Sequence, residues 1–241
     1  MKILKNTNEE FEFATEMSES LANAIRRSVL EIPVLAVDEV EFYKNDSVLY
    51  DEVLALRIGL IPLKNEKNMK MVDECTCNGK GCSKCTVQLK LKAKGPGFVY
   101  AKEIKGSAKP VYPEMPIVYL AEGQELELVA YARLGKGVQH TKYTPGLAYY
   151  RNVPEIEGDA SDSKVIERYP KGILKFEKGE VKLVDKYSCT FYDTDKNLGF
   201  RIVPSKEILF CVESWGQIPA KEIFIESVKA LKENLKEKLK F

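Results

Sequence analysis

The chain has 241 residues, which is enough for one large domain or two modest ones and too few for three full domains. Hydrophobic residues make up 44% of the chain and charged residues 30%, so it has the material for a core and is not a disordered polymer. Its 37 Lys and Arg against 36 Asp and Glu leave a formal charge of +1, and this balance argues against a protein whose main task is to neutralise phosphates.

Neither a membrane segment nor a leader sequence is expected. The apolar runs fall short of the roughly 18 residues that a membrane span requires, and the first 13 residues lack the apolar core of a signal peptide. We therefore expect a cytoplasmic protein whose cysteines stay reduced.

A hairpin and then a helix are predicted at the N-terminus. Residues 2–15 alternate around two phenylalanines and contain a polar turn, which is typical of a hairpin. Over residues 18–32, Ser18 can cap a helix and Pro33 must end it. The apolar side of this helix consists of Leu21, Ile25, Ser28 and Ile32. Arg26 and Arg27 lie about 100° apart on it, so at least one of them points away from that side.

The middle of the chain is predicted to be rich in strands. Residues 34–43 form a β-prone run, and residues 50–64 suggest a short helix that ends in a turn. Three alternating runs then predict an antiparallel sheet with one solvated face. These runs are 87–93, 98–104 and 125–134.

Turns and shorter β elements follow. Residues 135–145 (GKGVQHTKYTP) are rich in turn formers, and residues 152–164 have the composition of a linker. A hairpin is expected around Lys178 and Gly179, and a strand over residues 206–216 that ends in a glycine turn.

The strongest helical pattern lies at the C-terminal end. Pro219 suits a first helical position, and lysines gather toward the end of the segment, where they favour the helix dipole. One apolar stripe contains Phe224, Val228, Leu231, Leu235 and Leu239. Such a stripe must be covered, either by a sheet of the same chain or by another subunit.

Four of the six cysteines form a cluster with the spacing C-x-C-x4-C-x2-C. They are Cys75, Cys77, Cys82 and Cys85, and Gly79 and Gly81 allow the loop between them to fold back. Four thiolates suit Zn²⁺ in a closed structural site, with an iron–sulfur cluster as the rarer alternative and free thiols as the third.

The remaining candidates for chemistry favour structural interpretations. His140 is the single histidine, and its G-x-G-x-x-H context lacks the Lys-Ser/Thr of a phosphate-binding loop, so a structural turn is preferred. Cys189 and Cys211 are predicted to be buried small apolar residues, and Trp215 a packing anchor before the last helix. Catalysis within this chain is not expected.

Three blocks together resemble one family. Residues 20–63 are similar to the N-terminal signature of the D family of archaeal RNA polymerase subunits, which is related to the eukaryotic third-largest polymerase subunit and the bacterial alpha N-terminal domain. Residues 135–145 look like its second signature, and residues 210–235 resemble its closing strand and helix. The most specific positions are Asn23, Ala24, Arg26, Arg27, Arg57, Gly59, Ile61 and Pro62.

The resemblance implies an α+β fold with a discontinuous dimerisation domain, made of a sheet and two long helices. Residues 1–40, the connection 142–163 and residues 207–241 would form that domain. Residues 41–141 would form an inserted, mainly antiparallel β domain with the zinc loop, and residues 164–206 a small ferredoxin-like remnant.

The resemblance also implies a function and partners. The chain would be a non-catalytic assembly subunit of DNA-directed RNA polymerase, a nucleotidyltransferase complex. It would pair with the small subunit L and form the platform for the second-largest and other subunits, with no specific nucleic-acid or membrane contact of its own. The expected subunit interface comprises Leu21, Ile25, Arg26, Arg27, Phe224, Val228, Leu231 and Leu235, with Arg26 and Arg27 facing the second-largest subunit. Structural zinc at the four-cysteine loop is implied as well.

One departure from the family concerns residues 164–206, where many members of this family have a domain with iron–sulfur clusters. Tyr192 and Asp195 stand where cysteines would be needed beside Cys189, so no cluster is expected. Two other classes of function are weighed against the scaffold: a free-standing zinc module that binds nucleic acid, and a redox protein that uses Cys189 and Cys211.

Overall fold

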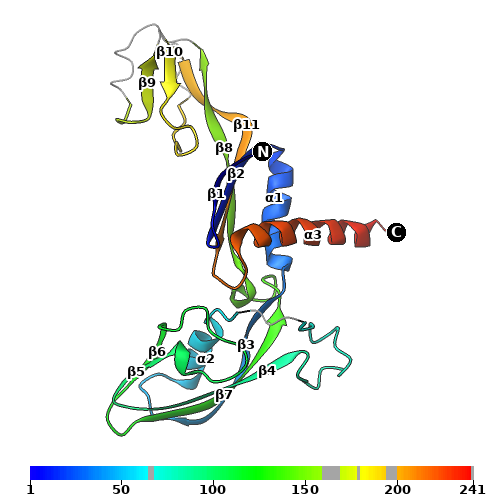
Figure 1. Ribbon diagram of the computed structural model, residues 1–241, viewed down its shortest axis with the longest axis vertical. Helices are drawn as coiled ribbons and strands as arrows, with labels where there is room; N and C mark the ends of the chain where they lie inside the picture. The colour runs from blue at the N-terminus through cyan, green and yellow to red at the C-terminus, as the bar shows by residue number, and fades with distance from the viewer. Residues whose placement is uncertain (65–67, 159–168, 178–179, 194–199, 240–241) are drawn as a thin grey trace. The chain divides into compact units, whose positions relative to one another are not determined.

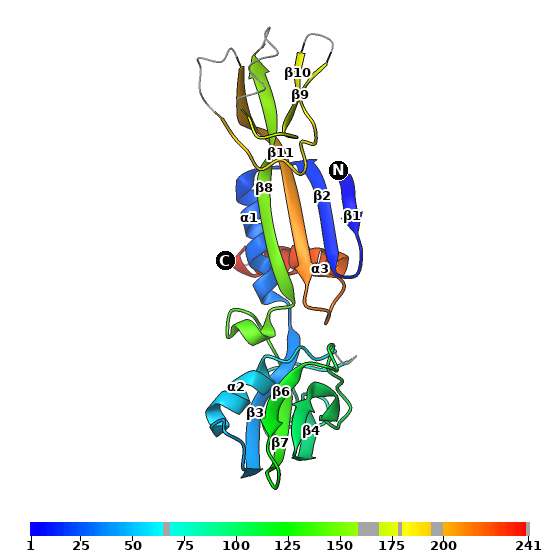
Figure 2. The ribbon, with the colours of Figure 1, turned by 90° about the vertical axis from the view of Figure 1, so that its left-hand side faces the viewer.

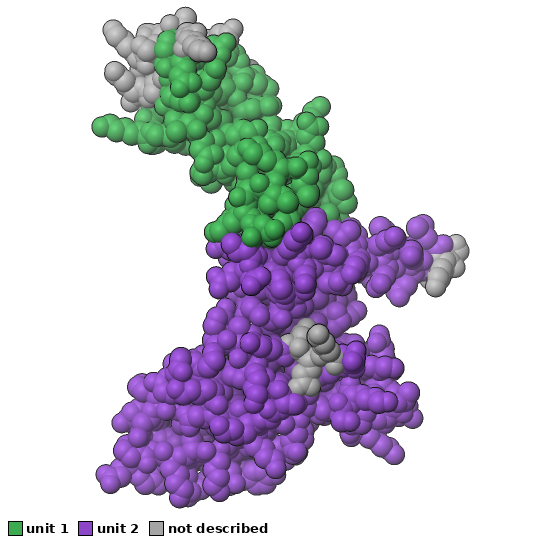
Figure 3. Space-filling model, viewed as in Figure 1, with its two compact units in different colours: residues 1–6, 11–26, 148–211 green, residues 7–10, 27–147, 212–241 purple. Residues whose placement is uncertain are grey.

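The computed structural model describes residues 1–64, 68–158, 169–177, 180–193 and 200–239. Over these residues the fold is α+β, with mostly antiparallel sheets and few helices (Figure 1). The chain divides into two compact units, coloured separately in Figure 3. Unit 1 consists of residues 1–6, 11–26 and 148–211, and unit 2 of residues 7–10, 27–147 and 212–241. None of the helices in these described segments is long and apolar enough to cross a membrane.

A four-stranded sheet with the order β1-β2-β11-β8 dominates unit 1. Its strands are β1 (Lys2–Asn6), β2 (Glu10–Glu16), β8 (Gly146–Gly158) and β11 (Phe200–Ser214). The predicted N-terminal hairpin is confirmed, because β1 and β2 pair antiparallel. Its phenylalanines pack in the interior: the Phe13 ring lies 5.4 Å from Phe11 and 5.7 Å from Phe210, centroid to centroid.

Helix α1 (Glu19–Ser28) lies along one face of this sheet (Figure 2). The backbone N–H of Leu21 donates to the Ser18 hydroxyl at 3.2 Å, so Ser18 is the cap that the sequence predicts. The predicted helix does not continue regularly to Pro33, because the last turn tightens into a 3-10 helix, Val29–Glu31.

A second hairpin, β9 (Leu174–Glu177) with β10 (Glu180–Leu183), lies in unit 1. This pairing confirms the hairpin predicted there, although its expected turn, Lys178 and Gly179, lies outside the described residues. A small core forms beneath it from Tyr169, Leu174, Val181, Phe200 and Ile202. The prediction of a linker over residues 152–164 is wrong for its first half, because β8 continues to Gly158. Residues 159–164 lie outside the described part of the chain.

Unit 2 is built on a three-stranded antiparallel sheet with the order β3-β7-β4. The strands are β3 (Val34–Asn45), β4 (Thr86–Lys94) and β7 (Glu125–Gly135), and helix α2 (Asp51–Gly59) packs against β3. Strand β4 alternates strictly between buried and exposed residues, which produces the one solvated face that its sequence predicts. The largest core of the described residues lies on the other face and includes Leu35, Leu54, Leu89, Ile117 and Leu128.

The prediction that residues 98–104 form a strand of this sheet is wrong. Strand β5 (Gly97–Tyr100) pairs with β6 (Pro116–Leu120) in a separate two-stranded sheet, and the chain then turns into a 3-10 helix at Ala101. The side chain of Glu103 accepts a hydrogen bond from the backbone N–H of Tyr100 at 2.8 Å, which favours that turn over a continued strand.

Helix α3 (Ala220–Lys238) closes the described chain and belongs to unit 2. Pro219 is its N-cap and not its first helical residue, a shift of one position from the prediction. The helix packs against the 3-10 helix Val29–Glu31 and buries Ala220, Ile223 and Ser227. Trp215, at the turn before it, is 44% exposed, so the prediction that it is a packing anchor is wrong.

Candidate metal centre and interface helices

The four clustered cysteines lie in the loop that joins α2 to β4. Short backbone hydrogen bonds shape this loop, from Asn78 N–H to Cys75 O at 3.2 Å and from Cys85 N–H to Cys82 O at 3.0 Å. Gly79 and Gly81 have φ of +80° and +77°, which a residue with a side chain rarely adopts. The prediction that these two glycines allow the loop to fold back is thus confirmed.

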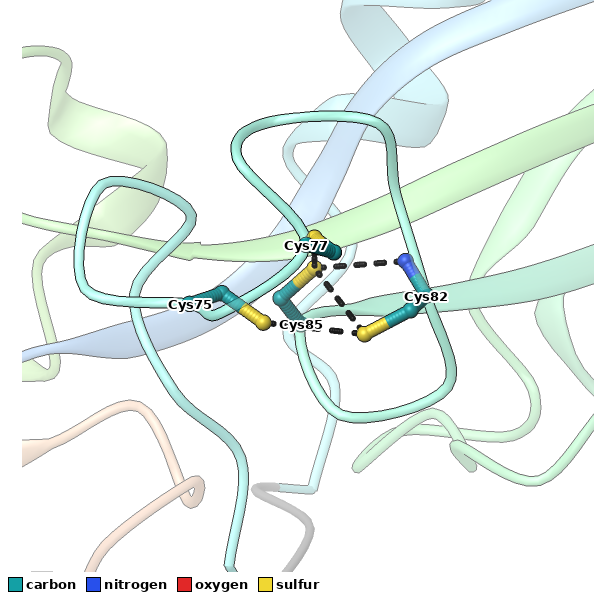
Figure 4. A group of neighbouring side chains, drawn as sticks. All are labelled: Cys75, Cys77, Cys82 and Cys85. Carbon is teal, nitrogen blue, oxygen red and sulfur yellow. Dashed lines mark hydrogen bonds between the residues drawn. The ribbon is translucent and has the colours of Figure 1, made fainter.

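The loop brings all four sulfurs to one point (Figure 4). Their Sγ atoms lie within 4.8 Å of one another. The Cys75–Cys82, Cys77–Cys85 and Cys82–Cys85 pairs are separated by 3.6, 3.5 and 3.9 Å. A tetrahedral zinc with bonds of about 2.3 Å separates its sulfurs by about 3.8 Å, so the cluster has the dimensions of such a site.

Hydrogen bonding separates the acidities of the two buried thiols. The pKa of Cys85 falls to about 6, chiefly because the backbone N–H of Cys82 donates to its sulfur at 3.4 Å, and the Thr86 hydroxyl acts in the same direction. The backbone N–H of Cys77 lowers the pKa of Cys75, but burial and the neighbouring thiols outweigh it and raise that pKa to about 11. Thiolates this close repel one another, and a divalent cation would relieve that repulsion.

This donor set fits a structural metal. A bound ion would supply folding energy to a loop with little apolar core of its own, and four protein thiolates leave no position for a substrate. Within the described segments, these cysteines are also the single group of three or more His, Cys, Asp or Glu side chains placed to hold a metal ion. The other two cysteines, Cys189 and Cys211, are buried as predicted. Asp195, part of the argument against an iron–sulfur cluster, lies outside the described residues.

The residues expected at a subunit interface on α1 differ in exposure. Leu21 is 47% exposed and Arg27 is exposed, whereas Ile25 is only 5% exposed and packs inside this chain. Arg26 is half-buried, and its guanidinium donates to the side-chain oxygen of Asn23 through Nε at 3.1 Å and Nη2 at 2.9 Å. The two arginines therefore point differently, as their spacing on the helix requires.

The expected stripe on α3 is distinct from the face that the helix buries in its own chain. Val228 is 39% exposed, Leu235 52% and Leu239 80%, while Phe224 and Leu231 are half-buried. At 100° per residue, the buried Ala220, Ile223 and Ser227 lie on the neighbouring side of the helix. The chain therefore leaves most of this apolar stripe uncovered over the described residues.

One cluster of polar residues was not anticipated from the sequence. Asp38 of β3 accepts hydrogen bonds from the Tyr143 hydroxyl at 2.9 Å, from Arg133 Nη1 at 3.1 Å and from Lys142 Nζ at 3.2 Å. Partial burial raises the pKa of Asp38, but these donors outweigh it and hold that pKa below its usual value. The turn 139–143 is itself structural, as expected, since the backbone N–H of Lys142 donates to His140 Nδ1 at 3.1 Å.

The signal that could have revealed this cluster is weak. Asp38 is the first charge after the apolar start of β3 and is followed directly by Glu39, and the turn that pairs with it follows about a hundred residues later. A buried or half-buried carboxylate needs partners, but the sequence alone does not identify them.

Comparison with known proteins defines first the class of this chain. Residues 40–147 match the family model described as the RNA polymerase Rpb3/RpoA insert domain. This range contains β4, β7, the second half of β3, α2 and the four-cysteine loop of unit 2. This part of the chain is therefore similar to the insert domain of the Rpb3/RpoA class of polymerase subunits.

Longer relatives then define the family. The chain is 38% identical to DNA-directed RNA polymerase subunit Rpo3 of Pyrococcus horikoshii, over 92% of this chain and 90% of that protein. It is 35% identical to Rpo3 of Methanothermobacter thermautotrophicus, over 91% and 89%, and 31% identical to Rpo3 of Archaeoglobus fulgidus, over 91% and 88%. The chain belongs to the Rpo3 family of DNA-directed RNA polymerase subunits. The resemblance stated from the sequence is confirmed.

Proposed function

We propose that this chain is a non-catalytic assembly subunit of DNA-directed RNA polymerase, which pairs with the small subunit L to form the platform for the large catalytic subunits. Membership of the Rpo3 family supports its place in a polymerase. The described residues contain no carboxylate cluster that could hold the Mg²⁺ needed for nucleotidyl transfer, which supports a structural role.

The observation that supports pairing most directly is the exposed stripe on α3. A helix of 19 residues that leaves Val228, Leu235 and Leu239 exposed presents an apolar surface typical of a subunit contact. In this proposal that stripe meets subunit L, together with Phe224 and Leu231. Leu21, Arg26 and Arg27 complete the interface, with Ile25 packed beneath it inside this chain, and the two arginines face the second-largest subunit.

The same proposal assigns the domains. Residues 1–40, 142–163 and 207–241 form the dimerisation domain, residues 41–141 the inserted domain, and residues 164–206 a ferredoxin-like remnant. The family model, which begins at residue 40, supports the first inner boundary.

Co-expression with subunit L tests the pairing. We expect a stable 1:1 complex on size exclusion, weakened about tenfold or more by Leu235→Glu or Val228→Glu, because each change places a charge in an apolar contact. Glu233→Lys is the matched control, since Glu233 is exposed on the side of α3 away from the stripe and its change should leave the complex intact. A chain that remains monomeric beside subunit L, or stripe variants that pair as the wild type does, would refute the proposal.

We also propose that the four-cysteine loop binds one structural zinc ion, because its four sulfurs have the spacing of a tetrahedral thiolate site. Metal analysis of protein purified without chelator should find about one zinc per chain. Cys77→Ser should lower that content, and Cys211→Ala, which changes a buried cysteine outside the cluster, should not. A zinc content below a small fraction of one equivalent per chain would contradict the proposed zinc site. Iron together with acid-labile sulfide would contradict the prediction that the chain has no iron–sulfur cluster.

A further inference from the structure

Thr86 connects the four-cysteine loop to the sheet of unit 2. It follows Cys85 directly, begins β4 and lies opposite Arg133 of β7 in the strand register. Its hydroxyl oxygen is 3.7 Å from Cys85 Sγ and 3.4 Å from Arg133 Nε. One half-buried hydroxyl therefore contacts a candidate metal ligand on one side and a guanidinium on the other.

The chemistry of the three groups gives these contacts a direction. A metal-bound thiolate can only accept hydrogen bonds, so the Thr86 hydroxyl must donate its proton to Cys85. The hydroxyl oxygen is then available to accept a hydrogen bond from Arg133, because a guanidinium can only donate hydrogen bonds.

Arg133 extends the connection to the turn 139–143. Its Nη1 donates to Asp38 at 3.1 Å and to Glu39 at 2.8 Å, and the other oxygen of Asp38 accepts from Tyr143 and Lys142. The loop and this turn both line a cavity of about 690 Å³. The loop contributes Met71, Val72, Asp73, Asn78 and Gly79, and the cluster contributes Asp38, Arg133, His140, Lys142 and Tyr143.

We propose that metal at the four-cysteine loop orders the turn 139–143 through Thr86, Arg133 and Asp38. Metal binding fixes the position of Cys85 Sγ, which fixes the Thr86 hydroxyl 3.7 Å from it and with it the guanidinium of Arg133, whose Nε lies 3.4 Å from that hydroxyl. Arg133 then holds Asp38 in position for Tyr143 and Lys142. Thr86 and Arg133 are positioning residues, and the wall of the cavity depends on the metal. This inference rests on the proposed zinc site and goes beyond the assembly role.

Amide hydrogen exchange on the full chain, in complex with subunit L if it is obtained that way, tests the proposal. The amides of Lys142, Tyr143 and Thr144 are good probes, because each donates a hydrogen bond within the turn, at 3.1, 3.0 and 2.9 Å. Removing zinc with a chelator should speed their exchange by about fivefold, the equivalent of one net hydrogen bond. The β5–β6 hairpin of the same unit should keep its exchange rate.

Two variants interrupt the connection without changing a cysteine. Thr86→Val keeps the β-branched shape and removes the hydroxyl, and Arg133→Lys keeps the charge but cannot reach Thr86 and both carboxylates together. With zinc bound, the amides of residues 142–144 in each variant should exchange as fast as those of the wild type without zinc. Removing zinc from the variants should not speed this exchange further. Thr76→Val, in the loop between Cys75 and Cys77 with an exposed side chain, is the matched control and should respond to chelation as the wild type does.

Metal content measured on the same samples separates the two proposals. Wild type with a full equivalent of zinc, whose turn exchanges equally with and without the metal, would overturn the connection and leave the zinc site standing. Variants of Thr86 and Arg133 that behave as Thr76→Val does would overturn it as well. A chain purified without any metal would overturn both. If Thr86→Val alone loses zinc, the proposal is still tested by Arg133→Lys and by the wild type measured with and without the metal.

Discussion

At Asp38, donors from two distant parts of the chain converge on one carboxylate. Arg133 approaches from the neighbouring strand β7, and Lys142 and Tyr143 approach from the turn that follows it. These bonds hold the ionised form, which is why the pKa of Asp38 is lowered despite partial burial. Burial first, and then the contact with Asp38, raise the pKa of the Tyr143 hydroxyl, so it remains a donor at neutral pH.

Asp38→Asn should therefore destabilise unit 2 at neutral pH by about 1 kcal/mol, a value reduced for the partial exposure of this side chain. Because the folded pKa of Asp38 lies below the unfolded one, its contribution is complete above the unfolded pKa near 4 and is lost as pH falls through the folded pKa. Urea unfolding followed by circular dichroism should show a constant difference between pH 7 and pH 5. That difference should shrink below about pH 4.

Asp73→Asn is the matched control for this measurement. Asp73 is an exposed aspartate that lines the same cavity, so its change should alter the free energy of unfolding by less than about 0.5 kcal/mol. An Asp38→Asn effect that is absent at pH 7, or that grows as the solution is acidified to pH 3, would show that the carboxylate is not held by these donors.

At the scale of elements, local patterns predicted most of the secondary structure. The hairpins β1–β2 and β9–β10, helices α1, α2 and α3, and the alternating strand β4 follow from periodicity and turn residues close together in the sequence. The cysteine spacing likewise predicted a four-sulfur centre, because all four ligands lie within eleven consecutive positions and the loop needs only local turns to join them.

The features that the sequence did not predict depend on contacts between distant segments. Residues 98–104 alternate like a strand, but strand pairing with β6 and the cap by Glu103 decide their structure. Trp215 has the size of an anchor, yet its exposure depends on which surfaces surround the turn. The Asp38 cluster joins β3 to a turn about a hundred residues away, and no local signal identifies that pairing.

Helix α3 combines a feature that the local sequence predicted with one that depends on distant contacts. Its periodicity predicted an apolar stripe, but periodicity does not indicate which part of an apolar surface the chain buries itself. The structure assigns Ala220, Ile223 and Ser227 to the chain's own interior and leaves Val228 and Leu235 exposed. This offset supports the proposed contact with subunit L, because one side of the helix packs inside this chain and a different side remains exposed for another subunit.

At the scale of the whole molecule, the near-zero net charge is accompanied by local pairing of opposite charges. On the solvated face of the unit 2 sheet, Glu125 lies 3.1 Å from Lys44 and 2.5 Å from Lys94, and Glu127 lies 2.7 Å from Lys92. Lysines that would form a basic stripe are thus neutralised by the central strand. A sheet of this kind does not present the positive surface that duplex DNA requires.

We therefore expect the chain to bind duplex DNA more weakly than about 100 µM at physiological salt, measured by fluorescence anisotropy. Replacing both central carboxylates, with Glu125→Gln and Glu127→Gln together, removes the partners of Lys92 and Lys94, while Lys44 keeps Asp46 at 3.3 Å. That variant should bind at least about tenfold more tightly, with a log–log salt slope approaching about −2, as expected for two phosphate contacts.

Glu52→Gln and Glu122→Gln together are the matched control, because both glutamates are exposed in unit 2 and the change in net charge is the same. If total charge alone governed binding, this variant would gain as much affinity as the first, whereas pairing on the sheet predicts little gain. Micromolar binding by the wild type, with a slope steeper than about −4, would instead favour the nucleic-acid-binding module over the assembly subunit, because such binding needs a basic surface that balanced ion pairs do not provide.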